Sequence, residues 1–116
     1  MIPFDLSEDF PHTWFIDLDG TIFKHNGCYE GGDELLPGVK ELWDTFSKDD
    51  AIIITSAREE RFKDMTIKFL NDNGLRFDHI IFGLPRGERV VINDIKPQGL
   101  KTAVAWNVNR DKGFPQ

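Results

Sequence analysis

Two acidic residues separated by one residue, Asp17 and Asp19, follow the apolar run at residues 14–16 and precede a Gly-Thr pair. The hydroxyl pair Thr55-Ser56 follows a second apolar run, and Asp94 follows a later one. Carboxylates can attack electrophiles, transfer protons and bind hard cations such as Mg²⁺. Together with hydroxyls, they indicate phosphoryl-transfer chemistry if the fold gathers them in one place.

Short apolar runs alternate with amphipathic stretches, which predicts an α/β domain with a parallel sheet. Ligands of such sheets bind beyond the carboxyl ends of the strands, so the acids and hydroxyls are expected to face one crevice. Crowded carboxylates repel one another, and a Mg²⁺ ion would remove that repulsion. The strands are expected at residues 14–16, 52–54, 79–82 and 90–92, with a fifth at 102–106.

Two helices are predicted between the first three strands. Apolar residues recur at helical spacing over residues 35–46, where Pro37 suits a first-turn position. Ser56 and Glu59 match a capping box, which would place the free N–H groups of the second helix beside the hydroxyl pair. A phosphate group could bind there.

A hairpin is predicted directly after the acid pair. Asn26-Gly27 lies between the segments 22–25 and 28–30, and Asn-Gly is the strongest short hairpin signal. The hairpin would hang over the acids.

Composition limits the classes of function. The 116 residues, 40% hydrophobic and 29% charged, predict one domain over residues 1–116 with a real core. A net charge of −6 disfavours a nucleic-acid partner. No apolar run approaches the roughly 20 residues of a membrane span, and the first residues lack the signal-peptide pattern, so we expect no membrane partner and a cytoplasmic protein. Cys28 is the only cysteine, which excludes an internal disulfide and a multi-cysteine zinc site.

The sequence Asp-Leu-Asp-Gly-Thr at residues 17–21 resembles the D-x-D-G-T signature of the haloacid dehalogenase-like (HAD) superfamily. Thr55-Ser56 resembles its second motif, and Ile92-Asn93-Asp94 resembles its acidic fourth motif. The resemblance spans the chain from Trp14 to about Trp106. It implies a three-layer Rossmann-like fold with a mostly parallel five-stranded sheet and a flap hairpin after the first strand.

The resemblance also implies a role for each motif residue. Asp17 would attack phosphorus to form an aspartyl-phosphate, and Asp19 would protonate the leaving oxygen and then activate water. Mg²⁺ would bind to the Asp17 side chain, the Asp19 backbone carbonyl and Asp94. Thr55 and the Ser56 N–H would bind the phosphoryl oxygens. The second acid favours phosphate esters, because the dehalogenase branch lacks it.

One position departs from the family pattern. Members usually carry a Lys before the fourth motif, and the matching position here is Leu84. We expect Arg86 to supply the missing positive charge, although an arginine does so with a different geometry. Lys24 on the flap and Lys96 beside the fourth motif are candidate substrate contacts. The alternative cations are Arg89, Lys96, Lys63 and Arg58.

The resemblance predicts a Mg²⁺-dependent phosphomonoesterase acting on a small phosphorylated metabolite. The intervals where relatives carry a cap domain are too short here, so we expect a capless form. Capless relatives act on bulky substrates or oligomerise, which makes a homo-oligomer one option. The overall pattern is similar to small phosphatases of bacterial surface-polysaccharide or sugar-phosphate metabolism.

Three other functions remain open. Leu84 is compatible with a degenerate, non-catalytic member that binds a phosphorylated ligand or a protein partner. A signalling receiver domain has similar length and alternation, but its third strand ends in an acid, whereas Phe82-Gly83 stands here. A polynucleotide end-phosphatase is disfavoured by the negative net charge.

Overall fold

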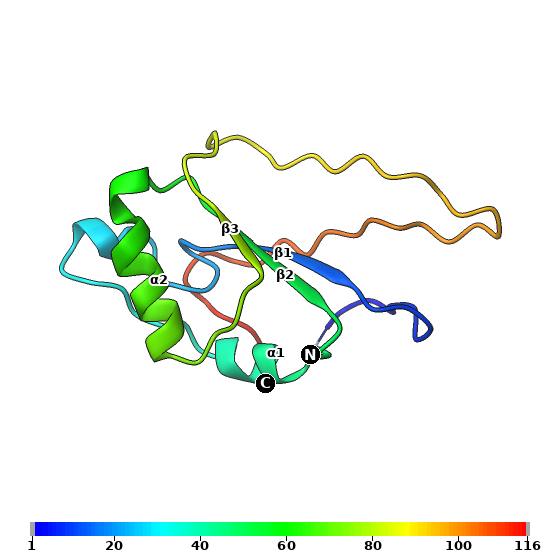
Figure 1. The fold of residues 1–116 in the computed structure, drawn as a ribbon, viewed down its shortest axis with the longest axis horizontal. Coiled ribbons are helices and arrows are strands. Elements are labelled where there is room, and N and C mark those ends of the chain that lie inside the picture. Colours follow the sequence, from blue (N-terminus) through cyan, green and yellow to red (C-terminus); the bar gives the residue numbers. More distant parts are fainter. Residues whose placement is uncertain (1, 116) are drawn as a thin grey trace.

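A three-stranded parallel sheet forms the centre of the structure, a computed structural model that describes residues 2–115. The strands β1 (Thr13–Asp17), β2 (Ala51–Thr55) and β3 (His79–Ile81) lie in the order β1-β2-β3 (Figure 1). Asp17 is in register with Thr55, and Thr55 is in register with Ile81. The ends of the three strands therefore lie side by side.

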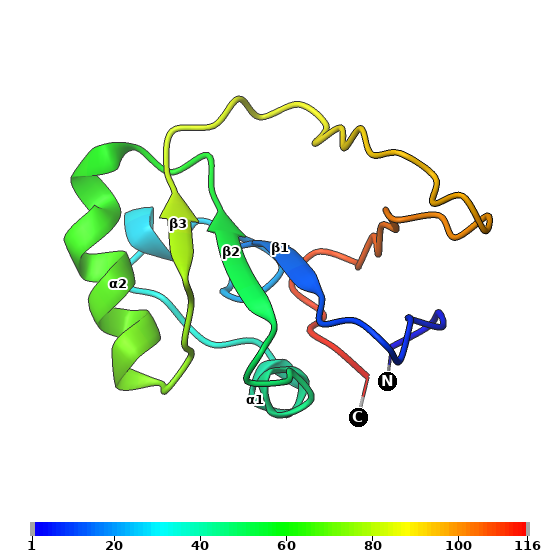
Figure 2. The ribbon, with the colours of Figure 1, turned by 45° about the vertical axis from the view of Figure 1, so that its right-hand side comes forward.

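Two α-helices connect the strands (Figure 2). They are α1 (Val39–Asp44) and α2 (Lys63–Asp72), and the short 3-10 helices η1 (Gly27–Tyr29) and η2 (Glu60–Phe62) lie in the loops. The first α-helix is shorter than the predicted 35–46, because Gly38 adopts a φ of 79° and the helix begins only after it. Among residues 2–115, no helix has the length and apolar character that a bilayer crossing requires.

The sheet has one buried face and one open face. Ile16, Ile52 and Ile54 pack into a core cluster to which both α1 and α2 contribute. Side chains alternate between faces along a strand, so Phe15 lies on the opposite side, where it is 60% exposed. The helices therefore cover one face, and the domain has two layers.

The predicted five-stranded, three-layer Rossmann-like fold is wrong. Only three strands form within the described residues, and the predicted strands at 90–92 and 102–106 lie outside the sheet. Val90 is 80% exposed and Ile92 is 90% exposed. A β-branched run specifies a strand only where a partner strand and a packing surface are within reach, and this run has neither.

Residues 86–105 instead form an extended arm that leaves the end of β3 and returns toward β1 (Figures 1 and 2). A tight turn reverses its direction, with the Lys96 N–H bonded to the Leu100 carbonyl at 2.9 Å. Side chains connect its two legs: the Thr102 hydroxyl donates to the Asp94 carbonyl at 2.6 Å. The two legs therefore contact each other near the turn, and neither adds a strand to the sheet.

The predicted flap hairpin over residues 22–30 is also wrong. Asn26 adopts the left-handed conformation with φ 59°, but a two-residue hairpin turn requires this at Gly27 as well, and Gly27 does not adopt it. The chain instead makes a wider loop, in which Phe23 bridges Leu35 and the Lys24 N–H donates to the Glu34 carbonyl at 2.9 Å. We call residues 24–34 the flap loop.

The C-terminal segment, residues 106–115, packs back against the loops around β1. The Phe114 N–H donates to the Pro37 carbonyl at 2.8 Å, and the Phe114 ring packs edge-on against Trp106. A side chain at Gly113 would overlap the Pro37 carbonyl oxygen, so a glycine is required at this close approach. The Asp111 N–H donates to the Gly20 carbonyl at 2.9 Å, which brings residues 106–115 close to the acid pair.

Candidate active site

The acid pair begins at the last residue of β1. Asp17 ends the strand, and Gly20, with φ 85°, turns the chain back so that the N–H groups of Ile22 and Phe23 both donate to the Leu18 carbonyl. This turn places the Thr21 hydroxyl 3.2 Å from Asp17 Oδ2, to which it donates a hydrogen bond. The Gly-Thr pair therefore orients the first carboxylate.

Asp17 is half-buried and faces an arginine from the arm. The Arg89 guanidinium lies 3.6 Å from Asp17 Oδ1. Burial is the largest influence on this carboxyl and raises the pKa of Asp17 above its ordinary value, although Arg89 and the Thr21 hydroxyl act in the opposite direction. The side chain is therefore a partly desolvated carboxylate whose ion-pair partner is Arg89.

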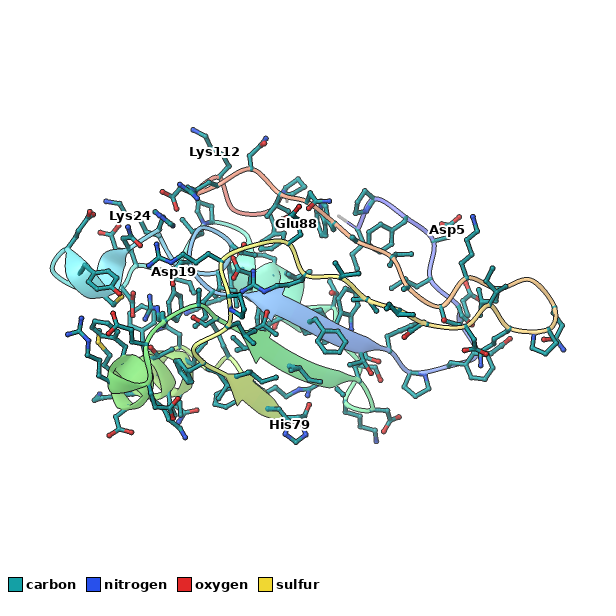
Figure 3. All side chains as sticks on the ribbon, turned by 90° about the horizontal axis from the view of Figure 1, so that it is seen from above. Asp5, Asp19, Lys24, His79, Glu88 and Lys112 are labelled. Carbon is teal, nitrogen blue, oxygen red and sulfur yellow. The ribbon has the colours of Figure 1, made fainter. Side chains whose placement is uncertain are left out.

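Asp19 is bound by a different arginine, Arg58. The Arg58 Nε donates to Asp19 Oδ2 at 3.0 Å, and Nη2 donates to Asp19 Oδ1 at 2.9 Å. Such a bidentate pair fixes both oxygens of a carboxylate. Figure 3 shows Asp19 beyond the carboxyl end of β1, at the opposite end of the molecule from the turn of the arm.

The same guanidinium connects two further elements. Arg58, 3% exposed, donates to both oxygens of Asp33 in the flap loop, at 2.9 and 2.6 Å, and to the Thr66 hydroxyl of α2 at 2.9 Å. Burial alone would lower the pKa of Arg58, but the hydrogen bonds to Asp33 and then Asp19 outweigh it and raise the pKa. We call Arg58, Asp19 and Asp33 the arginine clamp.

The hydroxyl pair lies at the end of β2, as predicted, but the Ser56 N–H bonds to the neighbouring strand instead of being free for a phosphoryl oxygen. Thr55 is buried and in register with Asp17. The Ser56 N–H donates to the Ile81 carbonyl at 2.9 Å, and the Ser56 hydroxyl accepts from the Arg58 N–H rather than capping a helix. Because α2 begins only at Lys63, no helix N-terminus lies directly after the hydroxyl pair.

The remaining predicted residues do not gather at the acid pair. Lys24 lies 4.0 Å from Glu34 within the flap loop. Arg86 lies near enough to Glu59 to contribute slightly to the lowered pKa of that carboxyl. Asp94 and Lys96 lie in the arm near its turn, where the Lys96 ammonium contacts the Phe10 ring at 5.2 Å. Asp17, Asp19 and Thr55 are thus brought together, whereas these four residues lie elsewhere.

A shallow cavity of about 260 Å³ lies over the acid pair. Its lining includes Asp17, Asp19 and the Gly20-Thr21 turn, and the C-terminal segment adds Val108 and Arg110. No motif in the sequence marks Arg110, because its proximity depends on how the end of the chain packs. The neighbouring Asp111 is the one weak indication in the sequence that this segment forms a turn, because an aspartate side chain can accept hydrogen bonds from backbone N–H groups in turns.

The three residues expected at a Mg²⁺ site do not lie together in the structure. Within residues 2–115, no three His, Cys, Asp or Glu side chains come together as metal ligands, since Asp94 lies in the arm. The Asp17 carboxylate and the Asp19 carbonyl are the expected ligands that remain, and Arg89 faces the carboxylate.

Comparisons with family models, curated proteins and solved structures find no match for this chain.

Proposed function

We propose that this chain is a HAD-like phosphomonoesterase that forms an aspartyl-phosphate on Asp17. One observation carries the proposal: Asp17 faces a cavity with one oxygen oriented by Thr21, the other beside Arg89, and a second acid, Asp19, in the same lining. A nucleophilic carboxylate needs this combination of orientation, nearby positive charge and a proton carrier.

In the first step, a carboxylate oxygen of Asp17 attacks phosphorus. A new O–P bond forms, the bond from phosphorus to the ester oxygen breaks, and the leaving alkoxide takes a proton. Negative charge spreads over the phosphoryl oxygens in this transition state, and Arg89 is the cation in contact with the attacking group. Thr55, in register with Asp17, is the one residue of β2 with a polar side chain.

In the second step, water attacks the aspartyl-phosphate, releases inorganic phosphate and restores the carboxylate. Asp19 is the proton carrier in both steps. Its two oxygens accept from Arg58, yet each carboxylate oxygen has a second lone pair. The clamp fixes the position of Asp19 while leaving it able to exchange protons with the cavity.

We propose a small phosphate ester of the sugar-phosphate class as the substrate. A net charge of −6 disfavours a polynucleotide, and the shallow cavity admits a small ester without a cap domain. The proposal includes a cytoplasmic location and allows a homo-oligomer. Dependence on Mg²⁺ stays a prediction from the resemblance, and no step above depends on the metal.

A second candidate is a non-catalytic domain that binds a phosphorylated ligand. The position of Asp94 in the arm and the engagement of both Asp19 oxygens by Arg58 favour it. It keeps the cavity and its arginines but forms no covalent intermediate.

The test is hydrolysis of p-nitrophenyl phosphate and a panel of sugar phosphates by the purified chain, with Mg²⁺ and with EDTA. Asp17→Asn should abolish turnover, and Asp19→Asn should reduce it by about 10²-fold or more. Asp64→Asn, an exposed acid on α2, is the control and should match the parent. Turnover that survives Asp17→Asn, or no turnover on any ester, would refute the phosphatase.

A further inference from the structure

Arg110 is an arginine at the cavity without a carboxylate partner. Within residues 2–115, Asp17 is paired with Arg89 and Asp19 is paired with Arg58, whereas Arg110 takes part in no ion pair. Each of the two acids in the lining is thus paired with an arginine, and Arg110 adds a positive charge that neither acid neutralises. An anion entering the cavity would meet this charge.

The residue directly after Arg110 is fixed by two tertiary hydrogen bonds. The Asp111 N–H donates to the Gly20 carbonyl at 2.9 Å, and the Asp111 side chain accepts from the His25 N–H at 2.7 Å. Asp111 adopts a left-handed φ of 63°, which is uncommon outside glycine. The tertiary hydrogen bonds of Asp111 thus stabilise a turn that directs the chain past the acid pair.

The side chain itself packs on the turn after β1. A Cβ built at Gly20 would lie 3.1 Å from the Arg110 Cγ, so the missing side chain leaves room for the arginine stem. The stem therefore rests on the backbone of the acid-pair turn, and Arg110 is one of the residues that line the cavity beside it. This arrangement positions a planar donor group for a phosphate, whose geometry a guanidinium matches with paired hydrogen bonds.

We propose that Arg110 is the residue that binds the anionic phosphate group of the ligand in this cavity. The inference rests on the proposed function for its substrate class, but phosphate binding can be measured without turnover. Recruiting the residue from the C-terminal segment explains why the motifs around the acid pair do not contain it.

The experiment titrates the full chain with inorganic phosphate by calorimetry and follows p-nitrophenyl phosphate kinetics in parallel. Arg110→Gln should weaken phosphate binding by about ten-fold or more and raise KM similarly, because a charged hydrogen-bond partner is lost. Arg110→Lys should fall between the two, since it keeps the charge but not the paired donors. Lys112→Gln removes the same charge from the same segment outside the cavity lining and should bind phosphate as the parent does (Figure 3).

The outcomes separate this inference from the proposed function. Phosphate binding that depends on Arg110 without any turnover would support the residue and refute the phosphatase. Turnover with a KM and a phosphate affinity unchanged by Arg110→Gln would overturn the inference alone. Equal weakening by Arg110→Gln and Lys112→Gln, or no phosphate binding by the parent, would also overturn it.

Discussion

Removing the guanidinium of the arginine clamp should destabilise the fold severely. Arg58→Met deletes five side-chain hydrogen bonds, four of them to carboxylates. The Asp33 side chain is 0% exposed and would be left buried without its partner, whereas Asp19, at 20%, can still reach water. Breaking one side of a buried ion pair costs about 3–5 kcal/mol, a large part of the roughly 5–15 kcal/mol that stabilises a small domain.

Urea unfolding followed by tryptophan fluorescence measures this loss. At about 2 kcal/mol per molar urea, the midpoint should fall by roughly 2 M. The matched control is Arg61→Met, because Arg61 pairs with Glu59 at the exposed surface and should leave the midpoint unchanged.

A second substitution makes the prediction sharper. Asp33→Asn in the Arg58→Met background removes the buried charge that lost its partner, so the double variant should be more stable than Arg58→Met alone. The reasoning would be refuted if Arg58→Met cost less than about 1 kcal/mol, as for a surface pair, or if Asp33→Asn destabilised it further. If Arg58→Met fails to fold, recovery of folded protein in the double variant gives the same answer.

Three other predictions concern charge and backbone. Arg89→Gln removes the cation that lowers the pKa of the proposed nucleophile, Asp17. The acid limb of the kcat/KM profile should therefore move to higher pH, and kcat/KM should fall about ten-fold. A larger effect of Arg86→Gln would contradict the geometry. Burial would raise the pKa of Asp50, but hydrogen bonds from three N–H groups lower it below 3.8. Asp50→Asn should therefore lower the free energy of unfolding by about 1–2 kcal/mol at pH 7. In urea unfolding, this difference from the parent should shrink below pH 3.8 rather than stay constant. Gly113→Ala should cost about 2–3 kcal/mol in the same assay, because the new side chain overlaps the backbone at a residue with a left-handed φ. The control Gly74→Ala, with φ 69° and no atoms nearby, should cost only about 1 kcal/mol. Equal losses would show that the overlap at Gly113 is relieved.

The sequence predicted the three strands that form because each run pairs with the next strand along the chain. The run at 52–54 lies within β2, where residues 52 and 54 are fully buried, and the run at 14–16 lies within β1. Crossover connections that contain α1 and α2 bring these runs together in parallel, as strand–helix alternation predicts. Local composition was sufficient here, because the partner strand was the next apolar run.

The same composition failed at residues 90–92, which are as apolar and β-branched as the run in β2. Their fate depends on whether the chain after β3 returns to the sheet, and no pattern within the run encodes that path. In the structure, a turn at Lys96–Leu100 closes the arm on itself. Asp94 therefore lies apart from the acid pair, although its sequence context matches a fourth motif.

The positions of the candidate site residues were predictable at the ends of the strands and not where loops meet. Asp17 and Thr55 follow from strand ends and register. Arg58 was considered only as a substitute for the missing lysine, because nothing in the sequence shows that Asp33 in the flap loop would share it with Asp19. Long-range ion pairs depend on loop paths, which propensity does not describe.

The repulsion that motivated the Mg²⁺ prediction has a different solution in this structure. Crowded carboxylates need positive charge, and Arg89 supplies it to Asp17 while Arg58 supplies it to Asp19 and Asp33. The acid pair is therefore compatible with folding without a divalent cation, and the charge argument alone no longer requires one. The case for Mg²⁺ now rests on the sequence resemblance, so the comparison of turnover with Mg²⁺ and with EDTA decides it independently of whether Asp17 is the nucleophile.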